Sequence, residues 1–377
     1  MLDMKDGTRR LGWKEMGERA GSVVVALSGG VDSAAAAASL LAEGWQVIGV
    51  TFRMWEEGAN QRTPGADAAC PLCALEGAAR VAGSLGIEHH VIDLRERFLS
   101  RVVEPFAREY LRGRTPNPCV ECNRKVKFPT LVEVADELGA ERVATGHYAR
   151  VCLDEGGSFL LLRSVAREKD QSYALYGLDQ EMLSRCLFPH GEREKREVRE
   201  AALALGLVAA DRGESQEICF LRGADYREFL SRRYPEALAP GPLEDTSGRE
   251  LGEHRGIAFF TVGQRRGLGI SVPHPMYVVA LDPSRRAVIV GRREEVPGTW
   301  LRAEAPHWIR GNPPGDSFAA EAMARYNAVP TRCRVELTED GFEAACEQRV
   351  WALTPGQHAV LYRGEEVLGG GVIASAS

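Results

Sequence analysis

The sequence predicts an α/β fold: a doubly wound parallel-sheet domain, then a small mixed central domain and a C-terminal antiparallel β-barrel. Two observations lead to this prediction. Strand-like and helix-like runs alternate through the first part of the chain, which is typical of βαβ units and a parallel sheet. Later, short runs of alternating polar and apolar residues are separated by turn signals, which is typical of small antiparallel barrels.

The α/β part is defined by strand-like and helix-like runs that follow one another. The strand-like runs lie at 23–27, 47–52, 89–94 and 142–150. The helix-like runs lie near 34–43, 74–85, 97–112 and 127–138. Helices then cover both faces of the sheet, and ligands of such sheets bind at the carboxyl ends of the strands. A site is therefore expected directly after the first strand.

The pattern changes in the second half of the chain. Residues 225–233 predict one short helix, after which three prolines break the chain. Short strands and glycine turns follow, with an exposed basic loop at Arg265–Gly269. Runs such as Arg332–Leu337 and His358–Tyr362 then alternate polar and apolar residues. The predicted units are an N-terminal extension at 1–20, a catalytic domain at 21–224, a central domain at 225–298 and a barrel at 299–377.

Composition excludes several classes of protein. No stretch of 18 apolar residues occurs, so a membrane span is not expected. The extension at 1–20 lacks the apolar segment of an export signal, and we interpret it as loose, or as upstream translation if Met16 is the true start. A cytoplasmic location follows, in which the nine cysteines are thiols, ligands or catalysts rather than structural disulfides. The net charge of −6 argues against a general nucleic-acid coat and leaves local basic surfaces open.

The loop Ser28-Gly29-Gly30-Val31-Asp32-Ser33 follows the first strand and precedes a helix. A glycine pair there allows a tight turn with exposed amide groups, and the helix N-terminus favours an anion. Two serine hydroxyls add donors, and Asp32 is suited to a magnesium ion carried by phosphates. The alternative is an ordinary strand-to-helix turn, but two serines and an aspartate in register favour phosphate binding.

Cysteines form the second informative pattern. Cys119 and Cys122 follow two prolines that flank Asn117, and their spacing suits a shared metal or a redox pair. A second pair, Cys70 and Cys73, lies upstream, and Cys219 lies far downstream in the sequence. The alternative for the two pairs is a zinc site, and the alternative for Cys219 is a buried, inert thiol. The role of Cys70 and Cys73 stays open.

The loop at 28–33 resembles the pyrophosphate-binding loop (PP-loop) of the ATP pyrophosphatases, which cleave ATP between its α and β phosphates. An ordered set of motifs narrows the resemblance to the tRNA-specific 2-thiouridylases. Besides the loop, these motifs are Gly-Arg-Thr-Pro-Asn-Pro at 113–118, Cys122-Asn123, Ala-Thr-Gly-His-Tyr at 144–148, Lys-Asp-Gln-Ser-Tyr at 169–173, Ile-Cys-Phe at 218–220, Gly-Gln-Arg-Arg-Gly-Leu-Gly at 263–269, Thr-Pro-Gly-Gln at 354–357 and Gly-Gly-Gly at 369–371.

This resemblance implies roles for individual residues. Cys122 matches the catalytic nucleophile of the family, and Cys219 matches the cysteine that carries a persulfide. The positions that match ATP-binding residues are Ala26, Leu27, Ser28, Gly29, Gly30, Val31, Asp32, Ser33, Phe52 and Gly146. The positions that match tRNA-facing residues are Asn117, Pro118, Cys119, His147, Lys169, Asp170, Gln171, Arg325, Tyr326 and Gln357.

The implied reaction is the replacement of the 2-carbonyl oxygen of the wobble uridine by sulfur, after ATP with Mg²⁺ has adenylated that oxygen. This chain differs from the family pattern at one position that affects the sulfur step: well-known members carry aspartate where this chain has Cys119. Cys119, Cys122 and Cys219 would then be able to ligate an iron–sulfur cluster. A persulfide route and a cluster route are therefore both open. Because the thiolate is the nucleophile, lowered thiol pKa values are expected.

The implied partners are tRNA, in particular the Lys, Glu and Gln acceptors, and a cysteine desulfurase or a sulfur-relay protein. Two other functions compete with this one. A PP-loop amidoligase would share the phosphate loop but has no use for Cys122 and Cys219. A non-catalytic, zinc-bearing RNA-binding protein would explain the cysteine pairs but not the phosphate loop. The thiouridylase hypothesis requires that segments around Gly30, Cys122 and Cys219 converge.

Overall fold

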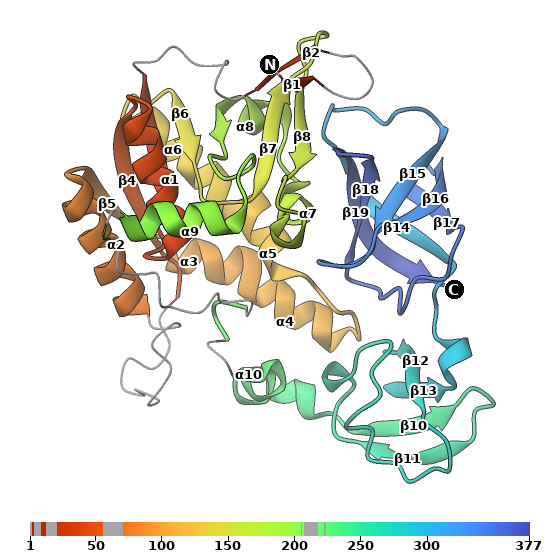
Figure 1. The fold of residues 1–377 in the computed structure, drawn as a ribbon. Helices are drawn as coiled ribbons and strands as arrows, with labels where there is room; N and C mark the ends of the chain where they lie inside the picture. The colour runs from red at the N-terminus through yellow and green to blue at the C-terminus, as the bar shows by residue number, and fades with distance from the viewer. Residues whose placement is uncertain are drawn as a thin grey trace.

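The structure, a computed structural model, describes residues 2–3, 9–12, 21–55, 71–204, 206, 218–221 and 224–377. Figure 1 shows three bodies: a parallel sheet with its helices, a barrel beside it, and a small domain beneath the barrel. These are the α/β domain, the C-terminal barrel and the central domain that the sequence predicts. No helix in the described part of the chain is long and apolar enough to span a bilayer.

The parallel sheet has the strand order β5-β4-β3-β6-β9 within the described residues. Its strands are β3 (Ser22–Ala26), β4 (Gln46–Arg53), β5 (Glu88–Asp93), β6 (Arg142–Ala144) and β9 (Cys186–Leu187). All neighbours pair in parallel. The chain adds β4 and β5 on one side of β3 and then β6 and β9 on the other. The topological switch point, where such sheets bind ligands, therefore lies at the carboxyl ends of β3 and β6.

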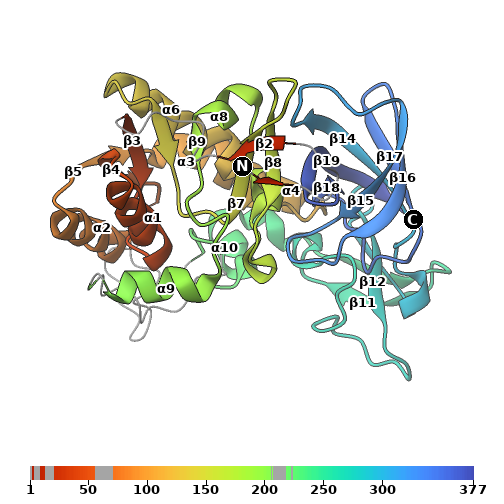
Figure 2. The same cartoon turned by 45° about the horizontal axis from the view of Figure 1, so that its top comes forward.

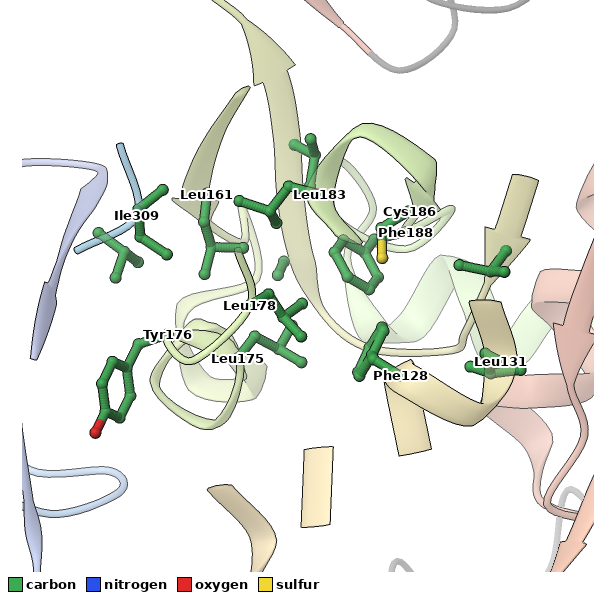
Figure 3. Packing of buried hydrophobic residues seen from close by; sticks show 14 of the residues in the cluster. Phe128, Leu131, Leu161, Leu175, Tyr176, Leu178, Leu183, Cys186, Phe188 and Ile309 are labelled. Atoms are coloured by element: carbon green, nitrogen blue, oxygen red, sulfur yellow. The ribbon is translucent and has the colours of Figure 1, made fainter. Parts of the chain in front are cut away.

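Helices cover both faces of this sheet, as the sequence predicts (Figures 1 and 2). One face packs on α1 (Val31–Ala42), α2 (Pro71–Leu85) and α9 (Lys195–Ala204). Alanine dominates the buried surface of α1, which allows the helix to approach the sheet closely. The other face packs on α6 (Phe128–Glu137) and α8 (Gln180–Arg185), and Figure 3 shows the tight packing of this second cluster.

Two helical runs are composite. The run predicted at 97–112 contains α3 (Arg95–Phe98), a π turn (Leu99–Val103) and α4 (Glu104–Leu111). The run near 127–138 is preceded by α5 (Pro118–Cys122) and a second π turn (Asn123–Lys127). Each π turn comes directly before a helix with proline in its first turn. Proline lacks the N–H that an α-helical ladder needs, so the wider turn fits there.

The single strand predicted at 142–150 is wrong. Strand β6 ends at Ala144, the chain turns, and β7 (Ala149–Leu153) pairs antiparallel with β8 (Phe159–Arg163) in another sheet. Glycine at 146 permits this turn, because a Cβ there would meet the backbone of the helix α1. A period-2 pattern continues through such a turn, so the local sequence did not reveal the break.

The barrel is closed by antiparallel pairing of six strands within residues 299–377, all of which are described. They are β14 (Trp300–Trp308), β15 (Ser317–Met323), β16 (Thr331–Leu337), β17 (Gly341–Cys346), β18 (His358–Arg363) and β19 (Glu366–Ala376). Alternate residues of β16 are buried, as its sequence pattern predicts. Strand β19 also pairs with β8, which joins the barrel to the α/β domain.

The N-terminal extension is not wholly loose. Strand β2 (Arg9–Gly12) pairs with β7, and β1 (Leu2–Asp3) pairs with β2. The central domain consists of α10 (Tyr226–Arg233) and a sheet of order β11-β10-β13-β12. Its strands are β10 (Gly241–Asp245), β11 (Glu250–His254), β12 (Tyr277–Asp282) and β13 (Ala287–Gly291). Short helices elsewhere are α7 (Ser172–Leu175) and the 3₁₀ turns Arg167–Lys169, Pro235–Leu238, Ile257–Phe259 and Arg293–Glu295.

Candidate active site

The phosphate loop lies between β3 and α1, where the sequence predicts it. Gly29 has a φ of +74°, a conformation that favours glycine, and Gly30 is the N-cap of α1. The Ser33 hydroxyl accepts a hydrogen bond from the Ser28 amide at 3.1 Å and donates one to the Gly30 carbonyl at 3.0 Å. Because the cap residue is glycine, no side chain caps this helix N-terminus. The loop is therefore closed on itself and presents a helix N-terminus suited to an anion.

Asp32, in the first turn of α1, is surrounded by three side chains. The Lys195 ammonium lies 2.7 and 2.9 Å from its two carboxylate oxygens. The Tyr148 hydroxyl donates to the same carboxylate at 2.9 Å, and His190 Nε2 donates to the Asp32 carbonyl at 2.7 Å. Asp32 would hold Mg²⁺ together with phosphate oxygens, since Mg²⁺ commonly uses one or two carboxylates and substrate phosphates. Such an ion would compete with Lys195 for the carboxylate.

Sequence reasoning missed Lys195 and His190. Lys195 is the first residue of α9, which packs against α1 although more than 150 residues separate it from Asp32. Nothing in the local pattern marks it, since it lies in a run of charged residues. The packing of α9 on α1 brings this cation to the phosphate loop.

The turn after β6 lies directly on the phosphate loop. A Cβ on Gly146 would lie 2.7 Å from the Asp32 carbonyl carbon and 2.8 Å from the Ser33 nitrogen, so only glycine fits. His147 Nδ1 hydrogen-bonds the Thr145 hydroxyl at 2.7 Å, and the His147 ring lies near Phe128. Burial, with a smaller effect of a nearby lysine, holds the pKa of His147 well below its usual value. His147 is therefore neutral at physiological pH.

Helix α5 carries two of the thiols. Asn117 is its N-cap and accepts a hydrogen bond from the Cys119 amide at 3.1 Å, and Pro118 occupies the first turn. Cys122 is 7% exposed, whereas part of Cys119 reaches the surface. Local sequence accounts for this arrangement, because an asparagine cap followed by proline starts a helix at this point.

Cys219 lies close enough to Cys119 and Cys122 for the thiols to interact electrostatically, and its side chain is exposed. Its neighbour Phe220 is buried in an aromatic cluster and lies 5.1 Å from Phe106 and 5.9 Å from Phe98, between ring centres. The same hydrophobic cluster includes Cys122 and, at its edge, Phe52 at the carboxyl end of β4. The thiols therefore gather beyond the carboxyl edge of the sheet, the edge that also carries the phosphate loop. Residues 207–217 lie outside the described residues.

The thiol pKa values differ from the expectation. Burial raises the pKa of Cys122 to about 11, and desolvation with the neighbouring thiols raises the pKa of Cys219 to about 12, although part of the Cys219 side chain is exposed at the surface. Burial also raises the pKa of Cys119, even though part of its side chain reaches the surface. Lys127 acts in the opposite direction on all three thiols but does not prevail. The prediction of lowered thiol pKa values is wrong for this structure, because desolvation disfavours the three thiolates more than Lys127 favours them.

The described residues contain no group of three or more His, Cys, Asp or Glu side chains arranged to hold a metal ion. Cys119, Cys122 and Cys219 influence one another electrostatically, but they do not fit a metal or cluster site in this arrangement. Cys70 lies outside the described residues, and so does the side chain of Cys73. The zinc alternative for these two pairs therefore stays a hypothesis.

The loop at 169–171 was expected to face tRNA. Asp170 is instead buried, and its carboxylate accepts hydrogen bonds from the Arg163 guanidinium and the Ser164 amide, both at 3.0 Å. The side chain of Gln171 accepts a hydrogen bond from the Tyr148 amide at 3.1 Å. Lys169 is partly exposed. In this structure, Asp170 and Gln171 hold the loop together rather than present their side chains outward.

Of the barrel residues expected to face tRNA, one is exposed and two have side chains that bond within the protein. Tyr326 is 40% exposed and lies beside the ring of Tyr173. The Arg325 guanidinium donates to two main-chain carbonyls, those of residues 351 and 352. The Gln357 amide points into the protein and donates to the Thr115 carbonyl at 2.9 Å. Tyr326 is therefore accessible to a partner, whereas the amide of Gln357 is already engaged.

Together, the parallel sheet and the Ser-Gly-Gly-Val-Asp-Ser loop define a nucleotide-binding α/β protein of the PP-loop class. Residues 21–223 match the tRNA methyl transferase HUP domain. Residues 227–292 match the tRNA methyl transferase PRC-barrel domain, and residues 299–373 match the aminomethyltransferase beta-barrel domain. Within this class, the chain belongs to the family of tRNA-specific 2-thiouridylases, MnmA.

The similarity to members of this family extends over nearly the whole chain. The chain is 48% identical over 358 residues to the tRNA-specific 2-thiouridylase MnmA of Heliobacterium modesticaldum, with 93% of this chain and 92% of the relative covered. It is 47% identical over 354 residues to that of Chloroflexus aurantiacus, with 94% and 98% covered. A 4-thiouridine synthetase–RNA complex with bound ATP is similar at 18% identity and a TM-score of 0.36, covering 57% of this chain and 51% of the other.

The raised pKa of Cys122 predicts a specific pH dependence of its chemistry. Because its pKa is about 11, alkylation of Cys122 in the protein without tRNA should rise about tenfold per pH unit from pH 7 to about 10. Iodoacetamide labelling with peptide mass spectrometry measures this rate. The same thiol in guanidinium-unfolded protein is the control and should level off near pH 9. A plateau near pH 8 in the folded protein would contradict the burial effect.

Proposed function

We propose that the protein is an ATP-dependent tRNA-uridine 2-sulfurtransferase that acts on the wobble uridine and releases AMP and pyrophosphate. One observation supports this most strongly: the phosphate loop and the thiols of Cys122 and Cys219 lie beyond the same carboxyl edge of one sheet. Activation by ATP and sulfur transfer require both groups at one base. Membership of the thiouridylase family supports the same function.

The first step is activation of a poor leaving group. The uridine 2-oxygen attacks the α-phosphorus of ATP, the bond to the bridging oxygen breaks, and pyrophosphate leaves. The helix N-terminus at Gly30 would hold the pyrophosphate, and the Ser28 and Ser33 hydroxyls shape the loop around it. Mg²⁺ carried by the phosphates would bind at Asp32 and offset their charge. Lys195 is placed to supply a second positive charge at the same point.

The second step transfers sulfur. Cys219 would carry a persulfide whose terminal sulfur bonds to the uridine C2, after which AMP departs with the former carbonyl oxygen. Attack by the Cys122 thiolate on the inner sulfur of Cys219 then breaks the S–S bond, leaves the sulfur on the base and forms a Cys122–Cys219 disulfide. A thiol reductant restores the two cysteines. Their raised pKa values keep both thiols largely protonated in the protein alone.

The sulfur donor would be a cysteine desulfurase, directly or through a relay protein, and a cytoplasmic location would keep the thiols reduced. The substrate would be the tRNAs that read Lys, Glu and Gln codons. The target uridine must leave its stack to reach the phosphate loop, as base-modifying enzymes require. The exposed Tyr326 offers a stacking surface of the kind that RNA-binding proteins use.

The cluster route remains a distinct chemical alternative. Because the described thiols do not form a metal-ligand group, we write no step through a cluster. Iron and inorganic sulfide analysis of anaerobically purified protein separates the two routes. The persulfide route predicts no stoichiometric iron and full retention of activity after iron chelation, once the chelator is removed and Mg²⁺ is resupplied. Stoichiometric iron and sulfide, lost together with activity on chelation, would replace it.

Substitution of the thiols should separate the two chemical steps. We expect Cys122→Ser and Cys219→Ser each to lower thiouridine formation about 100-fold or more, because without Cys219 no persulfide is carried and without Cys122 the sulfur is not released from it. Adenylation, with release of pyrophosphate in the presence of tRNA, should still occur, since this step needs neither thiol. Nucleoside mass spectrometry and pyrophosphate assays measure these quantities. Cys346→Ser, in the barrel, is the control and should keep both activities. Full thiolation by both active-site variants would contradict the proposed roles of the two thiols.

The close approach of Gly146 to the phosphate loop gives a second test. Gly146→Ala forces a Cβ to within 2.8 Å of main-chain atoms of Asp32 and Ser33, so the loop must shift. We expect the affinity for a non-hydrolysable ATP analogue with Mg²⁺, measured by calorimetry, to fall about tenfold or more. Gly83→Ala is the matched control, because a Cβ at that position on α2 meets no atom within 4 Å. Equal affinities in both variants would show that nucleotide binds elsewhere.

A further inference from the structure

The loop 112–117 connects α4 to α5, and three parts of the fold meet on it. Its own domain supplies both flanking helices. The central domain contacts it where the Thr115 hydroxyl donates to the Thr261 hydroxyl at 3.1 Å, and a Cβ on Gly113 would lie 3.2 Å from Leu281. The C-terminal barrel contacts it from the other side. Since α5 carries Cys122, whatever holds this loop also places the thiol.

The barrel holds the loop through both main-chain groups of one residue. The Thr115 amide donates to the Pro355 carbonyl at 2.8 Å, and the Thr115 carbonyl accepts from the Gln357 side-chain amide at 2.9 Å. Gly356 between them has a φ of +92°, and a Cβ there would lie 2.8 Å from the Thr115 nitrogen. The barrel turn therefore lies against the loop at a distance that only glycine allows.

The next barrel residue continues the contact toward Asn117. The main-chain carbonyl of His358 accepts from the Tyr173 hydroxyl at 2.9 Å, and its Nδ1 hydrogen-bonds the Tyr176 hydroxyl at 2.7 Å. The side chain of Tyr173 also hydrogen-bonds Asn117, the residue that caps α5. Burial lowers the pKa of His358 to about 4, so this link stays uncharged at physiological pH.

We infer that the barrel turn at 355–358 positions the nucleophile, with Gln357 acting as a positioning residue that fixes the loop before Cys122. This inference rests on the proposed function and deepens it. The resemblance places Gln357 against tRNA, but in this structure its amide donor is committed to Thr115. The barrel thus shapes the catalytic centre through its hydrogen bonds to the main chain of Thr115. Loss of the contact should lower kcat for thiolation more than it raises KM for tRNA.

Two variants test the inference from different directions. Gly356→Ala pushes the turn away from Thr115 without altering any side chain that can touch RNA. Gln357→Met keeps the length of the side chain and removes the donor. Gly364→Ala is the matched control, because Gly364 also has a positive φ, +59°, in the barrel but meets no atom within 4 Å. Thermal melting and circular dichroism confirm that each variant is folded.

The first measurement needs no substrate. Cys122 is 7% exposed, so loosening α5 should raise its rate of alkylation in the protein without tRNA several-fold in both test variants and not in Gly364→Ala. The fully buried Cys152 should stay unmodified in every variant, which excludes global unfolding. Unchanged alkylation of Cys122 in both test variants would overturn the inference.

The second measurement uses thiolation of tRNA. In both test variants kcat should fall about 10-fold or more, as misplacement of a reacting group does, with KM for tRNA changed less than about threefold. An increase in KM alone, confined to Gln357→Met, would make Gln357 a tRNA contact and overturn the inference. If the unmodified protein shows no thiolation, the proposed function fails, whereas the alkylation comparison still decides whether the barrel positions Cys122.

Discussion

The close approach of the turn after β6 to the first turn of α1 is the contact on which the site depends. Gly146 lies against the main chain of Asp32 and Ser33, at the switch point of the sheet. The same turn delivers Tyr148 to the Asp32 carboxylate, where α9 adds Lys195. Main-chain contact of this kind cannot be adjusted by rotating a side chain, so it sets the shape of the phosphate loop before any ligand arrives.

The positions and pKa values of the thiols depend on hydrophobic packing rather than on main-chain contact. Cys122 lies in an aromatic cluster that also contains Phe220, the neighbour of Cys219, and the pKa values of both thiols are raised, which disfavours their charged forms. A nucleophile that stays protonated in the protein alone resists wasteful alkylation, oxidation and sulfur transfer. The desolvation that accompanies this packing therefore also lowers the reactivity of the thiols.

The three bodies of the chain cooperate through the loop that precedes α5. Thr115 bonds to the barrel through its amide and carbonyl and to the central domain through its hydroxyl. Strand β19, which closes the barrel, also pairs with β8 of the α/β domain. A barrel held at two separate points has a defined orientation toward the sheet, so an RNA held by its exposed Tyr326 would be placed relative to the phosphate loop.

Local pattern alone determined the strands β3, β4, β5 and β16, the helices α1, α2, α6 and α10, and the phosphate loop, because each depends on residues that are neighbours in sequence. Only the tertiary structure decided the break after Ala144, the ion pair of Lys195 with Asp32, the raised pKa values of the thiols and the inward direction of Gln357. Each of these arises where segments distant in sequence pack together and exclude water, and no short stretch of sequence encodes which segment its partner will be.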